Sequence, residues 1–160
     1  NERTSEFLFT KPISRKEVFM TKVLALFSII SLSLLIQTLV AYLMILLVVN
    51  NTVDWNHLFE MHLNGYVLCL FFGAIGVVIS QTLKGIKNYM GPVVGVVMGT
   101  YFLHGIGSAV DDANWIAKFS PFHYLGVDEF NPLAIIVFTL AILLITLAAL
   151  RIFDRKDIGA

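Results

Sequence analysis

The sequence predicts an all-α protein, a polytopic bundle of transmembrane helices, and three observations lead to this prediction. Of the 160 residues, 58% are hydrophobic and only 14% are charged, and the mean hydropathy of +0.82 lies far outside the range of soluble proteins. Four apolar runs are each close to the ~20 residues that a helix needs to cross a bilayer. None of the runs alternates apolar with polar residues as the strands of a membrane barrel do.

We expect the spanning helices at about 23–49, 66–83, 92–110 and 132–150. They belong to a transmembrane domain at 23–160, which ends in a tail at 151–160 and follows a loop at 1–22. Two start signals support these limits. Asn131 before Pro132 predicts an N-cap followed by a proline at the first helical position, and Gly91 before Pro92 predicts a similar start.

The distribution of positive charge predicts the orientation of the chain. Ten of the eleven Lys and Arg residues lie in the N-terminal loop, in the turn at 84–90 or in the tail, and only Lys118 lies on the other side. Such an asymmetry over short loops marks the cytoplasmic face of the membrane. We therefore expect a multi-pass protein with both ends of this chain in the cytoplasm. A net charge of zero argues against nucleic acid as a partner.

The N-terminal loop predicts a long helix that begins at a capping box. The Ser14 side chain can accept from the backbone N–H of Glu17, and the Glu17 side chain can accept from the N–H of Ser14. A helix that runs from Ser14 to Val49 would measure roughly 50 Å, against ~30 Å of hydrocarbon. Its first turns must therefore stand in the cytoplasmic interface or beyond it.

Upstream of the capping box, residues 4–10 can form a second, short helix. Pro12 ends it, because a proline forces the preceding residue, Lys11, out of helical conformation. Phe7 and Leu8 would be exposed together on this helix, and an exposed apolar pair needs a partner. Attraction of basic residues to anionic lipid explains Arg15 but not the extra helix.

The first outer loop, at about 50–65, predicts a short helix that lies in the headgroup region. Asp54 can cap this helix. Its apolar residues share one face: Trp55, Leu58, Phe59 and Leu63. On the other face His57, Glu60 and His62 suggest a metal site, but they lack the i, i+4 histidine pair of a helical zinc site. A solvated face is the better interpretation, and we expect no metal.

The second outer loop, at about 111–131, predicts another short helix. Asp111 or Asp112 can start it, and Ser120 before Pro121 ends it. We expect the apolar residues of this helix to be buried: Trp115, Ile116 and Phe119. The two short helices together would cover the outer face of the bundle.

Few polar groups fall inside the predicted spans. Apart from Cys69 and the tyrosines, His104 is the only ionisable side chain there. Buried carboxylates and lysines are what ion-coupled carriers use, so their absence from the spans disfavours a channel or an ion-coupled carrier. Gln37, Thr38 and His104 are candidates for lining a transport pathway. Hydrogen bonds to water or to neighbouring helices explain the same three residues more simply.

The third predicted span carries glycines at intervals of four: Gly91, Gly95 and Gly99. This spacing makes a smooth stripe along a helix, so the stripe predicts a surface for close helix packing. Gly73, Gly76 and Ser80 form a smaller stripe on the second span. The two stripes can face each other across the turn at 84–90.

Three segments resemble the permeases of type-2 ABC exporters. The run T-S-E-F-L-F-T-K-P-I-S-R-K-E-V-F-M-T-K at 4–22 is similar to their cytoplasmic loop. The run S-P-F-H-Y at 120–124 is similar to the signature of their last external loop, and R-I-F-D-R-K-D-I at 151–158 to their basic tail. Two positions depart from the family pattern: Arg3 stands where glycine is usual, and Lys156 where arginine is common.

The resemblance implies a bacterial cell-membrane permease of about six spans, of which these four would be the last. It implies a dimer with a second permease copy or a homologous permease, and two separate ATPase subunits. It also implies that a coupling helix at 4–11 docks on the ATPase. The residues that would make this contact or flank it are Thr4, Glu6, Phe7, Leu8, Lys11, Pro12 and Arg15.

On this interpretation the chain is a transport subunit and not an enzyme. It contains no G-x-x-x-x-G-K-[ST] phosphate loop, so ATP and Mg²⁺ would be bound by the partner subunit and this chain would hold no cofactor. The substrate would be a lipophilic, peptide-like or antibiotic molecule moved outward. Two alternatives stay open: a non-transporting membrane interaction or immunity protein that uses the same loop as a binding site, and an ion channel or carrier.

Overall fold

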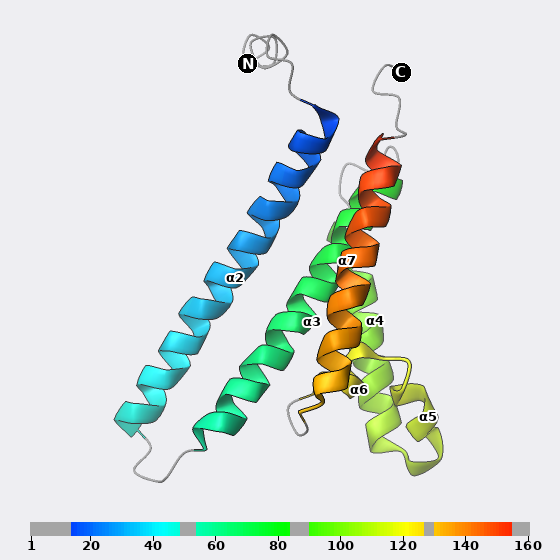
Figure 1. Ribbon diagram of the computed structural model, residues 1–160. Helices are drawn as coiled ribbons and strands as arrows, with labels where there is room; N and C mark the ends of the chain where they lie inside the picture. The colour runs from blue at the N-terminus through cyan, green and yellow to red at the C-terminus, as the bar shows by residue number, and fades with distance from the viewer. Residues whose placement is uncertain (1–13, 49–53, 84–89, 127–129, 155–160) are drawn as a thin grey trace.

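The computed structural model describes residues 14–48, 54–83, 90–126 and 130–154 (Figure 1). Within these ranges every regular element is a helix. In chain order they are α2 (Arg15–Val48), α3 (Trp55–Thr82), α4 (Met90–Ala109), the 3-10 helix η1 (Asp111–Ala113), α5 (Asn114–Ala117), α6 (Pro121–Tyr124) and α7 (Pro132–Asp154). By length and composition α2, α3, α4 and α7 can each cross a membrane, which confirms the prediction of an all-α polytopic bundle.

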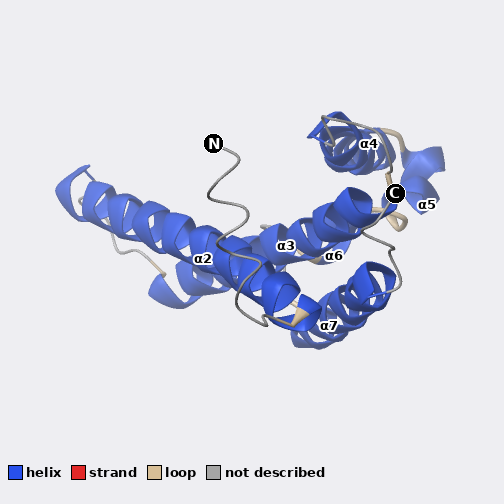
Figure 2. Ribbon diagram, turned by 90° about the horizontal axis from the view of Figure 1, so that it is seen from above, coloured by secondary structure: helices blue, strands red, loops and turns tan. Residues whose placement is uncertain are grey.

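The central helix of the bundle is α3, which packs against α2, α4 and α7. Figure 2 shows α4 and α7 on opposite sides of α3. In Figure 1 the start of α2 and the ends of α3 and α7 lie at one end of the bundle, and α5 and α6 lie at the other. We call these the proximal end and the distal end.

Three of the predicted helix starts are local and are confirmed in detail. The Asp54 carboxylate accepts from the backbone N–H groups of Asn56 and His57 at 3.0 and 3.2 Å. The Asn131 side chain accepts from those of Leu133 and Ala134 at 3.1 and 3.2 Å. Each cap satisfies N–H groups that have no acceptor inside the helix. The capping box at Ser14 is described with the site below.

The third span is described from Met90 onward, two residues before its predicted start at about 92. The helix α4 begins at Met90, so Pro92 is its third residue and not its first. A proline is tolerated there because the N–H groups of the first turn have no acceptor within the helix. The missing donor of Pro92 therefore costs no hydrogen bond.

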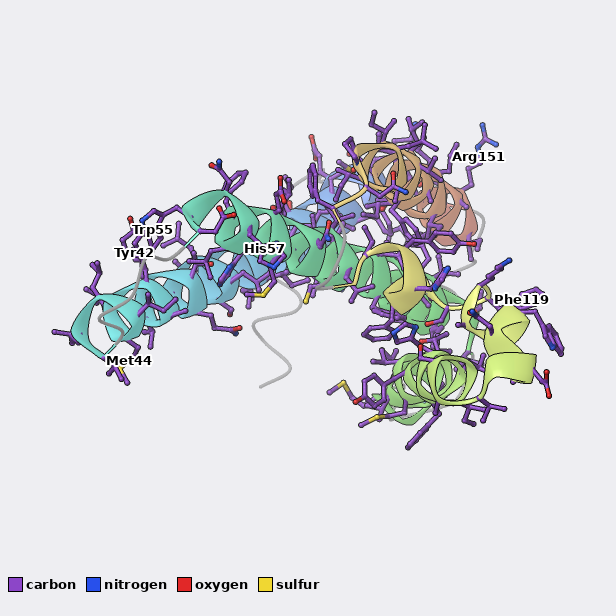
Figure 3. All side chains as sticks on the ribbon, turned by 90° about the horizontal axis from the view of Figure 1, so that it is seen from below. Tyr42, Met44, Trp55, His57, Phe119 and Arg151 are labelled. Carbon is purple, nitrogen blue, oxygen red and sulfur yellow. The ribbon has the colours of Figure 1, made fainter. Side chains whose placement is uncertain are left out.

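The prediction of a separate short helix after Asp54 is wrong. The residues from Trp55 onward are the first turns of α3, which continues without a break for 28 residues. No proline interrupts the run, so nothing ends the helix before Thr82. At about 42 Å it is longer than the ~30 Å hydrocarbon layer, and its start must project from the distal side. Figure 3 shows Trp55 beside Tyr42 of α2, with ring centroids 4.4 Å apart.

The second outer loop does begin with short helices, η1 and α5, but its bulky residues point away from the bundle. Trp115 is 62% exposed and Phe119 is 72% exposed, whereas we expected both to be buried. Ile116 is half-buried. The residues that pack instead are the small ones, Ala117 and Ser120. Figure 3 shows Phe119 on the outside of this segment.

Two apolar clusters hold the long helices together. The larger one joins α3, α7 and the residue after α6, through Val67, Ala74, Leu125, Ala134 and Ile142. The smaller one joins the start of α2 to the end of α7, through Phe19, Val23 and Ala149. Most of the remaining surface of the four long helices is apolar and exposed, as expected for helices that face lipid or further helices.

Candidate functional site

Most of the residues predicted to contact an ATPase lie outside the described residues. They are Thr4, Glu6, Phe7, Leu8, Lys11 and Pro12. Arg15 is the first residue of α2. The described chain begins at Ser14, shortly after Pro12, which ends the predicted short helix. The structure therefore shows the helix that the predicted coupling segment leads into.

The start of α2 is the capping box that the sequence predicts. The backbone N–H of Ser14 donates to Glu17 Oε2 at 2.9 Å, and the N–H of Glu17 donates to Ser14 Oγ at 3.2 Å. The two bonds satisfy two backbone donors at once and fix the residue at which the helix begins. From there α2 runs for 34 residues, or about 50 Å, with no interruption.

The first turns of α2 are packed against the last turns of α7. Phe19 is 2% exposed and Val23 is 4% exposed, and both lie against Ala149, which is completely buried. The rings of Phe19 and Phe153 have centroids 5.6 Å apart. Since the chain enters α2 only a few residues before Phe19, a displacement of the entry segment would act directly on the contact between α2 and α7.

Beyond these turns α2 touches the rest of the chain at few points. A Cβ added to Gly73 would lie 3.0 Å from Ile30 Cδ1, so this glycine lets α2 approach α3 closely. Ser31 Oγ and Tyr66 Oη share a hydrogen bond of 2.8 Å. Most of the large apolar residues of the distal half are exposed, among them Leu35, Leu39, Leu43 and Leu47.

The three predicted pathway residues are not gathered into one site. Gln37 is exposed on α2, and Thr38 Oγ1 donates to the Leu34 carbonyl of its own helix at 2.8 Å. His104 lies on α4, where its ring centroid is 6.3 Å from that of His123. In the described chain the buried Nδ1 atom of His104 has no hydrogen-bond partner. The residues therefore stand on two helices, and their role in a pathway stays a prediction.

The glycine stripe of α4 faces open space. A Cβ added at Gly91, Gly95 or Gly99 would meet nothing within 4 Å. The expectation that this stripe faces the smaller stripe of α3 is wrong, because α4 turns Val93 toward α3. Val93 lies 3.7 Å from where a Cβ of Gly76 would stand. The stripe stays a predicted surface for a helix other than the four seen here.

The S-P-F-H-Y segment joins α4 to α3 at the distal end. Ser120, 1% exposed, caps α6 by accepting from the Phe122 N–H at 3.2 Å, and its Oγ donates to the Thr100 carbonyl at 2.8 Å. The Phe122 ring has its centroid 5.6 Å from those of Phe72 and Tyr101. The segment is thus fixed by hydrogen bonds and ring contacts on two helices.

Two further contacts in the distal region were not predicted from the sequence. A Cβ added to Gly107 would lie 2.5 Å from the Ala117 backbone nitrogen, so the backbones of α4 and α5 touch there and only glycine fits. Asn64, 2% exposed on α3, donates from Nδ2 to the Gly126 carbonyl at 2.8 Å. A buried amide in an apolar helix is the one signal that could have indicated the second contact.

No group of three or more His, Cys, Asp or Glu side chains in the described part of the chain could hold a metal ion. The ring nitrogen Nδ1 of His62 is 2.8 Å from the Leu58 carbonyl oxygen of its own helix. His57 is exposed, as the solvated-face interpretation expects, whereas Glu60 and His62 are half-buried.

Comparison with protein-family models places residues 1–158 in a family described as ABC-2 family transporter protein. The match covers the predicted coupling segment, all four long helices and nearly all of the tail. The corresponding comparisons with curated proteins and with solved structures return no match.

Proposed function

We propose that this chain, which belongs to the ABC-2 family of transporter proteins, is the membrane-spanning permease of an ATP-binding-cassette exporter. It moves a lipophilic, peptide-like or antibiotic molecule outward, and a separate ATPase subunit supplies the energy by hydrolysing ATP. The four long apolar helices make the chain a multi-pass membrane protein. The positive-inside asymmetry assigns the proximal end to the cytoplasm, where an ATPase would be.

The observation that carries the proposal is the way α2 begins. Its capping box stands directly after the segment predicted to dock on the ATPase, and Phe19 and Val23 pack on α7 within the first turns. A displacement of the docked segment would therefore reach two transmembrane helices at once. The capping box fixes the residue at which the helix begins, and the buried contact with α7 links that start to a second transmembrane helix.

Co-purification with the ATPase tests the proposal. The chain is produced together with a candidate ABC ATPase subunit from the same organism, and the ATPase retained per permease is measured. We expect Phe7→Ala and Glu6→Ala to reach the membrane at normal levels but to retain severalfold less ATPase, because they remove an apolar contact and a charge from the docking helix. The exposed Phe59, on the distal half of the molecule, supplies the control Phe59→Ala.

Retention of the full complement of ATPase by both variants would overturn the assignment of the docking helix. A wild-type chain that binds no ATPase, and still protects cells, would overturn the exporter itself. That second result would favour the alternative, a membrane interaction or immunity protein.

A further inference from the structure

An open groove lies between the proximal halves of α2, α3 and α4, beside Phe153 at the end of α7, with a volume of about 480 Å³. This volume falls within the range of ~300–1,000 Å³ that small-molecule sites occupy. The groove has two unlike ends. The polar lining residues Lys22, Ser80 and Gln81 lie at its proximal end, beside the apolar Phe19, Met90 and Phe153. The end that lies deeper in the bundle is lined by Ile30, Cys69, Phe72 and Gly73. The polar groups are thus gathered at one end, as in an amphiphile.

The depth of the groove matches one leaflet of a bilayer. From Lys22 to Ile30 the axis of α2 rises by about 12 Å, and from Gln81 to Cys69 the axis of α3 spans about 18 Å. Half of the ~30 Å hydrocarbon layer is about 15 Å. A lipid chain with its headgroup at Lys22 would thus reach the far end of the groove near the middle of the membrane.

Two glycines make the groove possible. A Cβ on Gly73 would come to 3.0 Å from Ile30 Cδ1 and so would crowd the wall formed by α2. A Cβ on Gly76 would be in van der Waals contact with Val93, 3.7 Å away, and would narrow the space between α3 and α4. The glycines of α3 therefore leave room for a ligand as well as for close packing of the helices.

The charge of the described groove lining is positive. Among the described residues that line the groove, Lys22 is the one cation and none is acidic, and no ion pair of Lys22 occurs within the described chain. Beside it, Ser80 and Gln81 supply a hydroxyl and an amide that can donate to an anionic oxygen. Arg151, at the same end of the bundle, does not line this groove and points away from the helices in Figure 3.

We propose that this groove binds one anionic phospholipid of the leaflet at the proximal end. Lys22 and its polar neighbours hold the phosphate, and an acyl chain lies along α2 and α3 as far as Cys69. With the orientation proposed above this is the cytoplasmic leaflet, in which anionic lipids are concentrated. The site goes beyond the proposed export function and stands whether or not the chain exports anything, because it depends only on the described helices.

Cys69 gives a direct test, since it is the one cysteine of the sequence, is exposed and lines the apolar end of the groove. A bimane fluorophore is attached to it, and the protein is reconstituted without ATPase in phosphatidylcholine nanodiscs. Acyl-chain spin-labelled phosphatidylglycerol or phosphatidylcholine is then added at equal mole fractions. We expect phosphatidylglycerol to quench the bimane with about fivefold higher affinity, the preference that one lysine near the surface confers.

Two lysine variants separate a headgroup site from general contact with lipid, and a third variant tests the acyl-chain part of the groove. Lys22→Gln should remove the preference for phosphatidylglycerol, whereas Lys16→Gln, a neighbouring lysine of α2 that does not line the groove, should keep it. Gly76→Leu should weaken quenching by both lipids, because it fills the groove. Equal quenching by the two lipids in the wild-type protein, or a preference that survives Lys22→Gln, would overturn the proposal. Neither result depends on ATPase binding, so failure here leaves the exporter proposal to its own test.

Discussion

The proximal and distal ends of the bundle are held together in different ways. At the proximal end the described residues of α2 and α7 meet through apolar contacts, with Phe19 and Val23 set against Ala149. At the distal end α4 is joined to α5 and α6 by touching backbones at Gly107 and by the hydrogen bond from Ser120 to Thr100. Aromatic contacts of Phe122 extend this assembly to α3.

The difference bears on which end can move. Hydrogen bonds are directional and fix one geometry. Apolar contacts are not directional, and in a membrane they gain no hydrophobic driving force, because the lipid is as apolar as the side chains. The contact between α2 and α7 can therefore shift and form again, while the distal assembly keeps its shape. This is the arrangement that an exporter needs if an ATPase acts at the proximal end.

The largest effect on stability is expected from Phe19→Ala, which removes most of the contact between α2 and α7. We expect a loss of about 2 kcal/mol in the free energy of unfolding, below the losses in soluble cores, because the cavity term remains and lipid supplies no transfer term. Denaturant titration in detergent micelles, followed by circular dichroism, measures it. Phe59 is 69% exposed, so the control Phe59→Ala should change the same quantity by less than about 0.5 kcal/mol. Equal losses in the two variants would mean that α2 is not held by α7.

A smaller effect is expected from Gly107→Ala at the distal end. The new Cβ would stand 2.5 Å from the Ala117 nitrogen and must push α5 away. The cost of such overpacking exceeds the ~1 kcal/mol that alanine gains over glycine in a helix, and we expect a net loss of about 1–2 kcal/mol. Gly105→Ala is the matched control, because its Cβ would meet nothing within 4 Å and should leave stability unchanged or slightly raised. Thermal melting of the two variants measures the difference. A melting temperature of Gly107→Ala that is no lower than that of Gly105→Ala would contradict the close contact.

Features set by a few neighbouring residues could be predicted from the sequence, and features set by distant ones could not. The caps at Ser14, Asp54 and Asn131 were predicted because each depends on atoms within three residues. The burial of Trp115 was predicted wrongly because it depends on α4, where Gly107 admits the backbone of α5 and leaves the bulky residues outside.

The same reasoning applies to the sites. The coupling segment stays a prediction from its motif, and the structure adds what the motif could not give, namely that α2 rests on α7. The groove at Lys22 was not predicted, because its lining comes from four helices whose lateral arrangement no local pattern encodes. Gly73 and Gly76 were noted only as packing residues, although they also leave the space that forms the groove.

In the proposed mechanism, ATPase motion enters at the proximal end and displaces α2 while the distal assembly stays fixed. This mechanism is tested most directly with bimane placed at one of two positions in the complete complex with a cysteine-free ATPase. Native Cys69 reports on the groove beside α2, and Phe119→Cys in a Cys69→Ser chain reports on the distal assembly. We expect ATP with vanadate to shift the bimane emission at Cys69 and to leave the emission at position 119 unchanged. In the Phe7→Ala variant it should have no effect on the emission at Cys69. A shift at position 119 with none at Cys69 would contradict this mechanism.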